Sequence, residues 1–596
     1  MHVRQEHSQL LAWPRPHYTL HMSDIGPVGH GRRALDKAEQ RLAGRTTLQA
    51  ETAMMAHTVH IDRSVRPARI TVSEDFNICG FLVDRHLAEG RTDKPMARGR
   101  TWSLSYGELH AGVCRTANLL RSLGVGRGDR VMLLARDGPA FFFAFLGAVR
   151  LGAVVVPTNT FLRAADYAYM LADSNAKVVL AADSTIEEVI PALLQPGVAV
   201  EHRIAIDKPR SGWLAFDELL AVASPECPVT STTPNSPCFW LYSSGSTGAP
   251  KASVHEHKDM VYTSEFYAVG ALGLREDDVI FSAPKLFFAY GLGNSLSFPL
   301  YAGCTAVVLE DRPTAQNTLE MIERFEPTLY FGVPTLYAAQ VAAMEKGRPV
   351  RMPHARCCLS GGEPLPPAVM ERWKRLTGTD LLDGIGSSEA LHIYAQNLSG
   401  ATKPGSAGRA VAGYRLRIVD ADGTELPDGQ PGELVVQGES VARYYWNKPE
   451  TSAAAWTKDG WFRSGDTMYR DPDGFFFCGR GDDMLKVGGI WVAPFEIESA
   501  LAAHPAVIEA AVVGAPDEND LIKPKAYCVL RDAGSAGPDM ERELIALIKE
   551  CLAPFKYPRW IEFVDELPKT ASGKIQRFKL RATNRTGAHR AGERIE

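Results

Sequence analysis

The sequence predicts an α/β protein, in which a large domain built on a parallel sheet is followed by a small α+β domain. Two observations lead to this prediction. Between about residues 76 and 480, short apolar runs alternate with helix-like stretches, which is typical of parallel strands covered on both faces. Beyond residue 480 the pattern changes to IESALAAHPAVIEAAVVGAP and KAYCVL, and then to a charged helix-like stretch over residues 539–551. The chain has 596 residues, which is too many for one hydrophobic core.

The first clear α/β repeat begins at residue 130. RVMLLA is a short apolar run that ends in Arg-Asp-Gly, which predicts a strand over residues 130–135 and then a turn. PAFFFAFLGAVRLG predicts a buried helix closed by Gly152, and AVVVPTN predicts the next strand. KVVLAAD at residues 177–183 and TAVVLED at residues 305–311 predict further strands of the same kind. These segments together predict a parallel sheet.

Composition excludes several classes of protein. The chain is 45% hydrophobic and 23% charged, and its net charge of −5 argues against a binder of nucleic acid or of membrane surfaces. No apolar run is long enough to span a bilayer, and the first residues lack the apolar stretch of a signal peptide. The ten cysteines are scattered without a CxxC pair, and the adjacent Cys357 and Cys358 resemble core residues at a strand start. We therefore expect a reduced, cytoplasmic protein.

The first seventy residues differ from the rest because they offer little to bury. We expect residues 1–70 to form a disordered extension, or to be translated sequence upstream of a later start such as Met54 or Met55. A targeting arm is the functional alternative.

A glycine- and hydroxyl-rich segment, YSSGSTGAPK at residues 242–251, follows the strand-like PCFWLYS. Gly245 and Gly248 allow positive φ and a close approach of the backbone to a ligand. Successive N–H groups and neighbouring hydroxyls can form an anion-binding nest, to which Lys251 adds a positive charge. Because Pro250 precedes the lysine where a Walker loop has glycine, a P-loop NTPase is disfavoured. A surface loop without a ligand is the alternative.

Two other motifs lack the spacing that their chemistry needs. His255 and His257 in HEH do not have the HExxH spacing that puts two zinc ligands on one helix face. GLGNSL, after Tyr290, lacks the third glycine of a dinucleotide-binding fingerprint.

Six segments carry a family resemblance because they occur together and in a fixed order. They are YSSGSTGAPK, SGGEPLP, DGIGSSE, WFRSGD, GRGDDMLKVGG and PKTASGKIQR. Over about residues 76–581 the chain resembles the adenylate-forming superfamily of acyl-CoA synthetases, luciferases and peptide-synthetase adenylation domains. KLFFAYGLGNSLSFPL and GSSEALHIY more narrowly resemble the benzoate–CoA ligases.

The resemblance implies a large N-terminal domain of stacked α/β sheets with a β-rich subdomain, at residues 71–481. A small, mobile α+β domain at residues 482–596 would carry the catalytic lysine. The implied enzyme is an ATP-dependent ligase that activates benzoate or a substituted benzoate as acyl-AMP. It then transfers the acyl group to CoA, releasing AMP and pyrophosphate. ATP, Mg²⁺ and CoA are thus expected, without nucleic acid or membrane, and a homodimer is left open.

The chemistry of adenylation explains why such residue types are needed. A carboxylate resists nucleophiles, and its attack on the α-phosphorus of ATP brings two anions together, so catalysis consists mostly of positioning and charge neutralisation. One alternative function is loading of an acyl group onto a carrier-protein thiol. Another is a non-catalytic nucleotide sensor, which the presence of Lys574, Glu389 and Asp466 argues against.

The resemblance also assigns site residues. It makes Lys574, Glu389 and Thr247 catalytic, with Glu389 as the Mg²⁺ ligand. It places ATP or AMP against Ser243, Ser244, Gly245, Ser246, Thr247, Gly248, Lys251, Gly362, Glu363, Pro364, Asp383, Gly384, Ile385, Ser388, Asp466 and Arg480. Within this set, residues 362–364 and 383–385 would line the adenine, Asp466 would accept both ribose hydroxyls, and Arg480 would contact the ribose or a phosphate. It places the acid against Phe288, Ala289, Tyr290, Gly291, Gly386, His392 and Ile393, with Phe288 as an aromatic gate. It places CoA against Lys486, Gly488, Gly489, Tyr557 and Arg559, after the C-terminal domain rotates at the hinge Asp482.

The chain departs from the family pattern at four positions. Ser388 stands where threonine is usual, and Ile385 stands where the wider superfamily has an aromatic residue. Ala252 replaces the glycine that usually follows the motif lysine. Ala390 replaces a larger residue of the benzoate ligases, which would widen the acid pocket for a hydroxy- or amino-substituted ring or a cyclohexane acid. The sequence leaves the choice of acid open.

Overall fold

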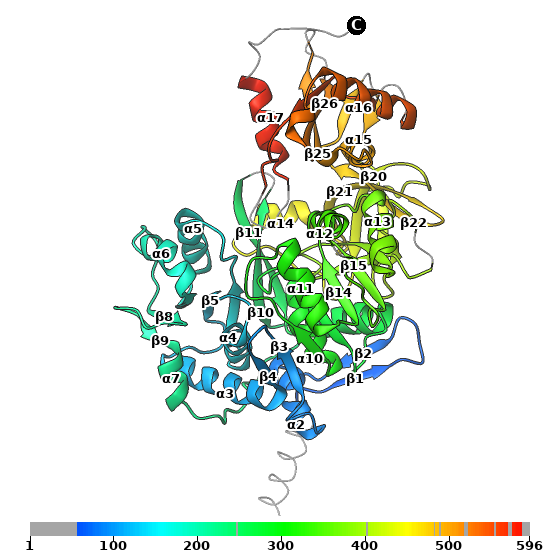
Figure 1. Ribbon diagram of the computed structural model, residues 1–596. Helices are drawn as coiled ribbons and strands as arrows, with labels where there is room; N and C mark the ends of the chain where they lie inside the picture. The colour runs from blue at the N-terminus through cyan, green and yellow to red at the C-terminus, as the bar shows by residue number, and fades with distance from the viewer. Residues whose placement is uncertain are drawn as a thin grey trace, which may run out of the picture. The chain divides into compact units, whose positions relative to one another are not determined.

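A sheet of seven strands organises the first half of the protein (Figure 1). The computed structural model describes residues 56–245, 248–347, 349–400, 403–481, 483–487, 490–517, 522–552, 556–569 and 575–586. The strand order is β11-β10-β6-β5-β7-β8-β9. The strands are β5 (Arg130–Leu134), β6 (Val154–Pro157), β7 (Val178–Ala182), β8 (His202–Ile206), β9 (Leu214–Ala215), β10 (Pro237–Gly245) and β11 (Gly248–Glu256). All neighbours pair in parallel except β10 and β11, which form an antiparallel hairpin.

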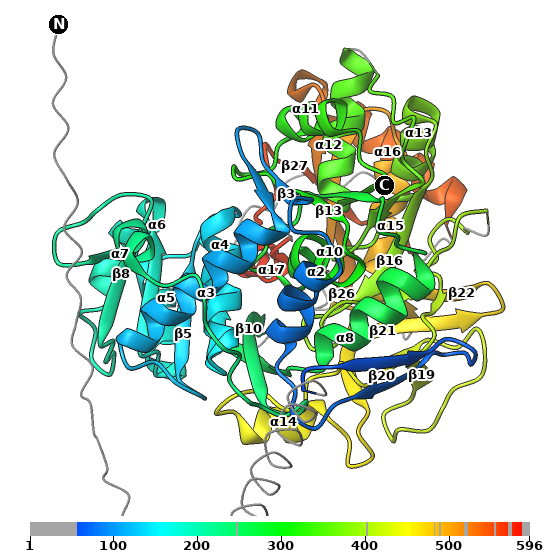
Figure 2. The same cartoon turned by 90° about the horizontal axis from the view of Figure 1, so that it is seen from below.

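Helices cover both faces of this sheet, as the continuous apolar strands predict. Helices α3 (Tyr106–Ser122) and α4 (Pro139–Arg150) lie side by side (Figure 2) and share a core cluster with Val131 and Leu133. The alternate residues of β5 belong to a second cluster with α5 (Ala164–Ser174) and α6 (Asp183–Ala192). A short helix, α7 (Phe216–Val222), follows β9. The predicted strand, helix and strand from residue 130 onward are therefore confirmed.

A second sheet has nine strands in the order β18-β17-β16-β15-β14-β12-β13-β3-β4. Its strands are β3 (Pro95–Arg98), β4 (Ser103–Ser105), β12 (Val279–Ser282), β13 (Thr305–Val307), β14 (Leu329–Gly332), β15 (Cys357–Ser360), β16 (Leu381–Gly386), β17 (Ile393–Gln396) and β18 (Arg409–Ala410). The pairs that join β3, β13, β12, β14, β15 and β16 are all parallel. Helices α11 (Ala315–Phe325), α12 (Pro334–Lys346) and α13 (Pro367–Thr377) share the core cluster on one face. Cys357 and Cys358 are buried in β15, as predicted.

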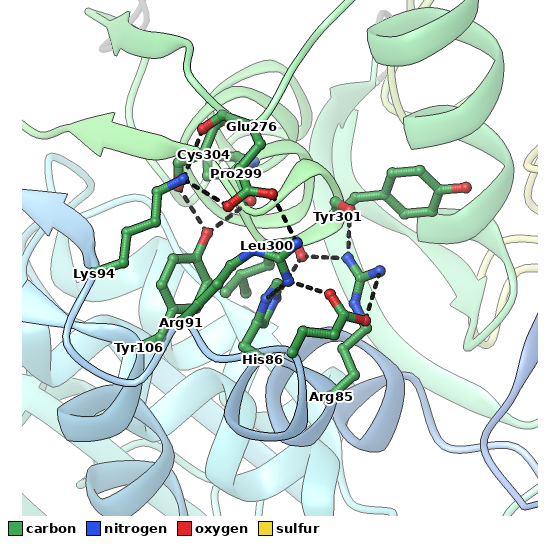
Figure 3. A network of polar contacts seen from close by, with 11 residues as sticks. Arg85, His86, Arg91, Lys94, Tyr106, Glu276, Pro299, Leu300, Tyr301 and Cys304 are labelled. Atoms are coloured by element: carbon green, nitrogen blue, oxygen red, sulfur yellow. Dashed lines mark hydrogen bonds and ion pairs between the residues drawn. The ribbon is translucent and has the colours of Figure 1, made fainter.

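One helical segment between β12 and β13 carries residues that the sequence assigns to the acid pocket. It consists of α9 (Ala289–Leu292), the π-helical η3 (Gly293–Ser297) and α10 (Phe298–Ala302). Figure 3 shows donors from α2 (Arg85–Ala88) and α3 around the end of α10. His86 Nε2 lies 2.8 Å from the Leu300 carbonyl, and Tyr106 donates to the carbonyls of Pro299 and Cys304 at 3.0 and 2.7 Å. The bond to Leu300 satisfies a carbonyl in the last turn of α10, and the two bonds from Tyr106 tie the end of this helix to α3.

Antiparallel structure flanks the two sheets. β19 (Arg415–Val419), β20 (Gly432–Gln437), β21 (Phe462–Asp471) and β22 (Gly474–Arg480) form the β-rich part that the resemblance implies, with α14 (Pro449–Ala455) between them in sequence. Two further helical segments, α8 (Asp259–Thr263) and the π-helical η2 (Ser264–Ala271), follow β11, and η1 (Gly80–Asp84) precedes α2.

The expected disordered extension over residues 1–70 needs a correction at its end. β1 (Val59–Asp62) and β2 (Arg69–Val72) pair as an antiparallel hairpin. The hairpin is held by Arg63, whose guanidinium binds the buried carboxylate of Glu265 through two hydrogen bonds of 2.6 and 2.7 Å. Ordered structure therefore begins before residue 70, and residues 1–55 lie outside the described part.

The residues after 482 form the expected small α+β unit. A three-stranded sheet contains β25 (Val507–Pro516), β26 (Ile522–Leu530) and β27 (Trp560–Phe563), and a hairpin contains β23 (Leu485–Val487) and β24 (Ile490–Val492). Its helical segments are α15 (Pro494–Ala502), η4 (Ala533–Ser535), α16 (Pro538–Cys551) and α17 (Arg577–Thr586). Among the described helices, none combines the length and the apolar character needed to cross a membrane.

Candidate active site

The glycine- and hydroxyl-rich segment lies at the tip of the β10–β11 hairpin. The ladder continues further than the sequence suggests, because Ser243 pairs with Lys251 and Gly245 with Gly248. The hairpin is tied to α5 by Tyr242, which donates to Asp173 Oδ2 at 2.6 Å. Ser246 and Thr247 lie outside the described residues, as do the side chains of residues 244–249. The anion-binding role of this tip therefore stays a prediction.

Lys251, Glu389 and Tyr445 form a compact polar cluster. Tyr445 donates to Glu389 Oε1 at 2.7 Å, and Lys251 Nζ lies 2.6 Å from the Tyr445 hydroxyl and 3.6 Å from the same carboxylate oxygen. Glu389 is 7% exposed and Tyr445 is 2% exposed. Burial and the adjacent Glu389 carboxylate raise the pKa of Tyr445, so this phenol is a neutral donor. The cluster places a cation and an oriented carboxylate beside the hairpin tip.

The segment around Glu389 is positioned by His255, a residue of the HEH sequence. His255 is completely buried and each ring nitrogen faces an oxygen. Nδ1 lies 2.9 Å from Asp259 Oδ2, and Nε2 lies 2.8 Å from the Ser388 carbonyl. The Glu389 carbonyl also accepts a hydrogen bond of 2.7 Å from the Ala442 amide. These two contacts make His255 a structural support for the segment that carries Glu389. Among the described residues, no group of three or more His, Cys, Asp or Glu could hold a metal ion.

Asp466 and Arg480 face each other across β21 and β22. They are register partners, and Arg480 donates to Asp466 Oδ1 at 2.7 Å and to the Ser464 carbonyl at 3.1 Å. Asp466 is 8% exposed. Gly465, which lies between Ser464 and Asp466 in the chain, has a φ of 72°, a backbone conformation that favours glycine. The structure thus brings together Asp466, which the resemblance assigns to the ribose, and Arg480, which it assigns to the ribose or a phosphate.

The segments assigned to adenine lie at the ends of the adjacent strands β15 and β16. Gly362 follows β15 with a φ of 88°, which a side chain would strain. Asp383 lies within β16, and burial raises the pKa of its carboxyl to about 8. Gly384 pairs with Gln396 of β17 and leaves no room for a side chain, since an added Cβ would lie 2.5 Å from Gln396 Oε1. Ile385, which continues the same strand, is half-buried.

His392 stands at the centre of the residues assigned to the acid. Its Nε2 lies 3.3 Å from the Tyr290 carbonyl and 3.2 Å from Asn294 Oδ1, which fixes the tautomer with the proton on Nε2. Its ring centroid lies 4.8 Å from that of Tyr267 and 4.6 Å from that of Phe298. Burial lowers the pKa of His392 to about 3, so the ring is neutral.

Glycines bring the two walls of this region close together. Gly386 pairs with Ile393, and a Cβ at Gly386 would lie 2.4 Å from the His392 carbonyl oxygen. A Cβ at Gly361 would lie 3.2 Å from Ile393 Cδ1 and 3.3 Å from Tyr290 Cζ. The SGGEP segment therefore contacts both Tyr290 and Ile393, which joins the region assigned to adenine to the region assigned to the acid.

Three phenylalanines form a chain of ring contacts beside the acid residues. Phe288 lies 4.7 Å from Phe287 between ring centroids, and Phe287 lies 6.1 Å from Phe161. Phe288 is half-buried, whereas Phe161 is 41% exposed. Phe287, the middle ring, is 4% exposed, so burial is greatest at the centre of this chain of contacts, and the gate role of Phe288 stays a prediction. Ala390 is completely buried in a core cluster that also contains Ile393, and the wider acid pocket expected from its small side chain stays a prediction.

The residues assigned to CoA and to the catalytic lysine are only partly described. Asp482, Gly488, Gly489 and Lys574 lie outside the described residues, as does the side chain of Lys486. The Tyr557 ring lies 4.0 Å from the Arg559 guanidinium and 4.6 Å from the ammonium of Lys549, which the sequence analysis did not assign. Two cations around one aromatic ring can hold a phosphate-bearing ligand.

The segment after Lys574 is firmly anchored. Arg577 Nη2 binds both carboxylate oxygens of Glu498, at 2.9 and 2.8 Å. Burial alone would lower the pKa of Arg577, but Glu498, with smaller effects of Asp483 and Glu363, raises it.

Four supporting residues were missed by the sequence analysis: Tyr445, His255, Asn294 and Tyr267. Each acts on an assigned residue through a contact between segments far apart in the chain. The spacing of HEH gave the one local signal, and it pointed only to a metal site that was rejected.

Comparison with known proteins shows that the chain belongs to the family of AMP-binding enzymes. Residues 84–446 match the family of AMP-binding enzymes, and residues 496–574 match the AMP-binding enzyme C-terminal domain. A benzoate–CoA ligase of Thauera aromatica is 47% identical over 524 residues, which cover 87% of this chain and 98% of that protein. A 4-hydroxybenzoate–CoA/benzoate–CoA ligase of Rhodopseudomonas palustris is 42% identical, covering 85% of this chain and 94% of that protein.

A solved structure shows the same architecture. The anthranilate CoA ligase AuaEII, in complex with anthranoyl-AMP, superposes with a TM-score of 0.82 at 38% identity. The match covers 87% of this chain and 99% of that one. The predicted fold class, a large α/β domain followed by a small α+β domain, is confirmed by this likeness.

Proposed function

Since the chain belongs to the AMP-binding enzyme family, we propose that it is an ATP-dependent ligase that joins an aromatic acid to CoA through an acyl-AMP. The observation that carries this conclusion is the 47% identity to a benzoate–CoA ligase along 98% of that enzyme's length. The reaction has two halves. The acid first attacks the α-phosphorus of ATP and releases pyrophosphate, and the CoA thiol then displaces AMP.

Three charged residues, Lys251, Asp466 and Lys574, are proposed to bind ATP and to stabilise the charge that develops during adenylation. Lys251 lies at the hairpin tip, where an ammonium can neutralise the departing pyrophosphate. Asp466 is held by Arg480 so that its carboxylate can accept hydrogen bonds from the ribose hydroxyls. Lys574 is proposed to bridge the acid carboxylate and the α-phosphate as charge builds between them.

Mg²⁺ is an expected partner of ATP, and the donor chemistry at Glu389 fits it. A hard cation prefers carboxylate oxygens, and Mg²⁺ is usually held by one or two carboxylates together with substrate phosphates. Glu389 Oε1 is oriented by Tyr445, and its backbone is fixed through the Ala442 amide and, at Ser388, through His255. When bound, the ion would neutralise phosphate charge and orient the triphosphate.

The acid pocket supports a flat, uncharged ring. Tyr290, Phe298 and the neutral His392 surround this region, and burial holds the pKa of His392 at about 3. A charged ring substituent would find no counter-ion among these three side chains. We therefore propose benzoate, hydroxybenzoates or aminobenzoates as substrates, in keeping with the acids in the names of the relatives.

A screen of pyrophosphate release with aromatic and alicyclic acids tests this function. We expect release with benzoate or a monosubstituted benzoate that depends on ATP, and thioester formation with CoA. No release with any ring-bearing acid would contradict the proposal. A carrier-protein thiol used in preference to CoA would support the alternative function. The cytoplasmic location and the oligomeric state stay predictions.

A further inference from the structure

A buried cation lies directly before the proposed aromatic gate. Lys285 is 5% exposed, and its ammonium is 2.5 Å from the Leu309 carbonyl, 3.1 Å from that of Glu310 and 3.0 Å from that of Asp311. This segment follows β13, whereas Lys285 follows β12. An ammonium has three donors, and these three carbonyls can use all of them.

The fourth neighbour of this ammonium comes from the other sheet. Asp137, which follows β5 and is 3% exposed, has its Oδ2 at 3.5 Å from Lys285 Nζ. Its Oδ1 accepts a hydrogen bond of 3.2 Å from the Leu286 amide. Burial raises the pKa of Asp137, against the opposing effects of Lys285 and of the Leu286 amide. The Asp137 carboxylate thus contacts both the ammonium of Lys285 and the backbone amide of Leu286.

The backbone of Lys285 in turn shapes the acid site. Its carbonyl accepts a hydrogen bond of 3.0 Å from the Phe288 amide. A Cβ at Gly291 would lie 2.1 Å from the same carbonyl oxygen, so the chain from Lys285 to Gly291 folds back on itself. Phe288 and the first residues of α9, Ala289 and Tyr290, lie on this stretch, residues 285–291, which we call the gate loop. The start of the gate loop is fixed by the buried ammonium of Lys285, and its end is fixed because Gly291 packs against the Lys285 carbonyl.

We propose that Lys285 and Asp137 are positioning residues for the acid gate. They join the ends of strands from the two large sheets at the point where the gate loop begins, and through the Lys285 carbonyl they set the place of Phe288 and Gly291. Neither side chain contacts the reacting atoms. This inference rests on the proposed function, because it assigns the effect to use of the aromatic acid.

Asp278 and Arg356 provide a matched control pair, because they lie at the opposite ends of strands in the same nine-stranded sheet. Arg356 donates to Asp278 Oδ2 at 2.7 Å and to the Leu272 carbonyl at 3.1 Å, and Asp278 is 2% exposed. Asp278 precedes β12 and Arg356 precedes β15, whereas Lys285 follows β12. This pair has the same chemistry, a cation that binds a buried aspartate and backbone carbonyls, but lies away from the gate loop.

The test compares Lys285→Met and Asp137→Asn with Arg356→Met and Asp278→Asn in the full-length enzyme. KM for the aromatic acid and for ATP is measured by pyrophosphate release, and Tm by calorimetry. We expect all four variants to lower Tm. Only the first two should raise KM for the acid, by about tenfold, because a displaced gate misplaces the substrate. KM for ATP should stay within about twofold of the wild-type value.

Asp137→Asn keeps the shape of the side chain and an acceptor for the Leu286 amide. If Lys285→Met does not fold, the KM values of Asp137→Asn therefore still test the inference. A shift in Tm without a rise in acid KM would overturn the inference, and so would equal rises in the KM values for acid and ATP. A wild-type enzyme that uses no aromatic acid would instead overturn the proposed function, and this inference with it.

Discussion

The hydroxyl of Tyr445 donates a hydrogen bond to Glu389 Oε1 at 2.7 Å, and Lys251 lies against both groups. Tyr445 is 2% exposed and comes from a segment 56 residues away from Glu389. Because burial and Glu389 raise the pKa of Tyr445, the phenol stays a donor throughout the useful pH range. Tyr445 therefore fixes the orientation of the carboxylate that is proposed to bind Mg²⁺.

We predict that Tyr445→Phe increases the Mg²⁺ concentration needed for half-maximal pyrophosphate release by about tenfold. A hydrogen bond to a charged group contributes about 1.5–3 kcal/mol, and its loss frees Glu389 to rotate. Glu389→Gln should abolish most of the activity at any Mg²⁺ concentration. Tyr444→Phe is the matched control, since the neighbouring Tyr444 is 39% exposed. An unchanged Mg²⁺ dependence in Tyr445→Phe would refute the role given to this bond.

Asp466→Asn should weaken use of ATP without affecting the acid. The substitution removes the charged acceptor for the ribose and the ion pair of 2.7 Å between Asp466 and Arg480. We expect KM for ATP to rise by about tenfold or more, because charged hydrogen bonds are lost, with KM for the acid nearly constant. Asp428→Asn is the control, since Asp428 pairs with Arg470 and its side chain is 52% exposed. A parallel rise in both KM values would argue against a ribose contact.

Lys574→Ala separates the two half-reactions. The variant should bind ATP but lose most acyl-AMP formation, whereas thioester formation from supplied acyl-AMP and CoA should persist. The anchor between Arg577 and Glu498 does not involve this side chain, so the small domain should remain folded. Lys579→Ala, at an exposed position of α17, is the control. Normal pyrophosphate release by Lys574→Ala would remove this lysine from the mechanism.

The fold could be predicted largely from the sequence because apolar periodicity is a local signal. RVMLLA and AVVVPTN became β5 and β6, and PAFFFAFLGAVR became α4. The N-terminal hairpin could not be predicted in this way. β1 and β2 are short and half-exposed, and the ion pair from Arg63 that holds them is made with Glu265, 202 residues away. No pattern in residues 59–72 reports such a partner.

In the candidate site, too, the residues that lie in sequence motifs could be predicted, whereas the role of residues that act through tertiary contacts could not. Asp466 and Arg480 each lie in a sequence motif, and their pairing follows from the adjacent antiparallel strands β21 and β22, which are close in sequence. Tyr445 lies in no motif, and Asn294, although it lies within KLFFAYGLGNSLSFPL, acts on His392 only through a tertiary contact. Lys285 is the first residue of KLFFAYGLG, yet nothing in this motif indicates that its ammonium binds three backbone carbonyls of a distant segment.

Buried neutral histidines should make the enzyme labile to acid. Burial lowers the pKa of His86 to about 4 and those of His257 and His392 to about 3. The ordinary pKa of histidine is about 6.5, so below that pH the unfolded chain binds more protons than the folded one. Each histidine then costs about 1 kcal/mol of stability per pH unit, down to about its folded pKa. Asp383 acts in the opposite sense, because its raised pKa of about 8 stabilises the fold as the pH falls from about 8.

The measurable consequence is a Tm that changes little or rises slightly from pH 8 to 6.5 and then falls steeply toward pH 4.5. His257→Asn should reduce that fall, because an asparagine oxygen can replace Nδ1 as the acceptor for the Ile78 amide at 3.2 Å and does not take up a proton. His354→Asn, at a side chain that is 61% exposed, should leave the fall unchanged. If His257→Asn loses as much Tm between pH 6.5 and 4.5 as the wild type does, protonation of His257 is not what unfolds the protein in acid.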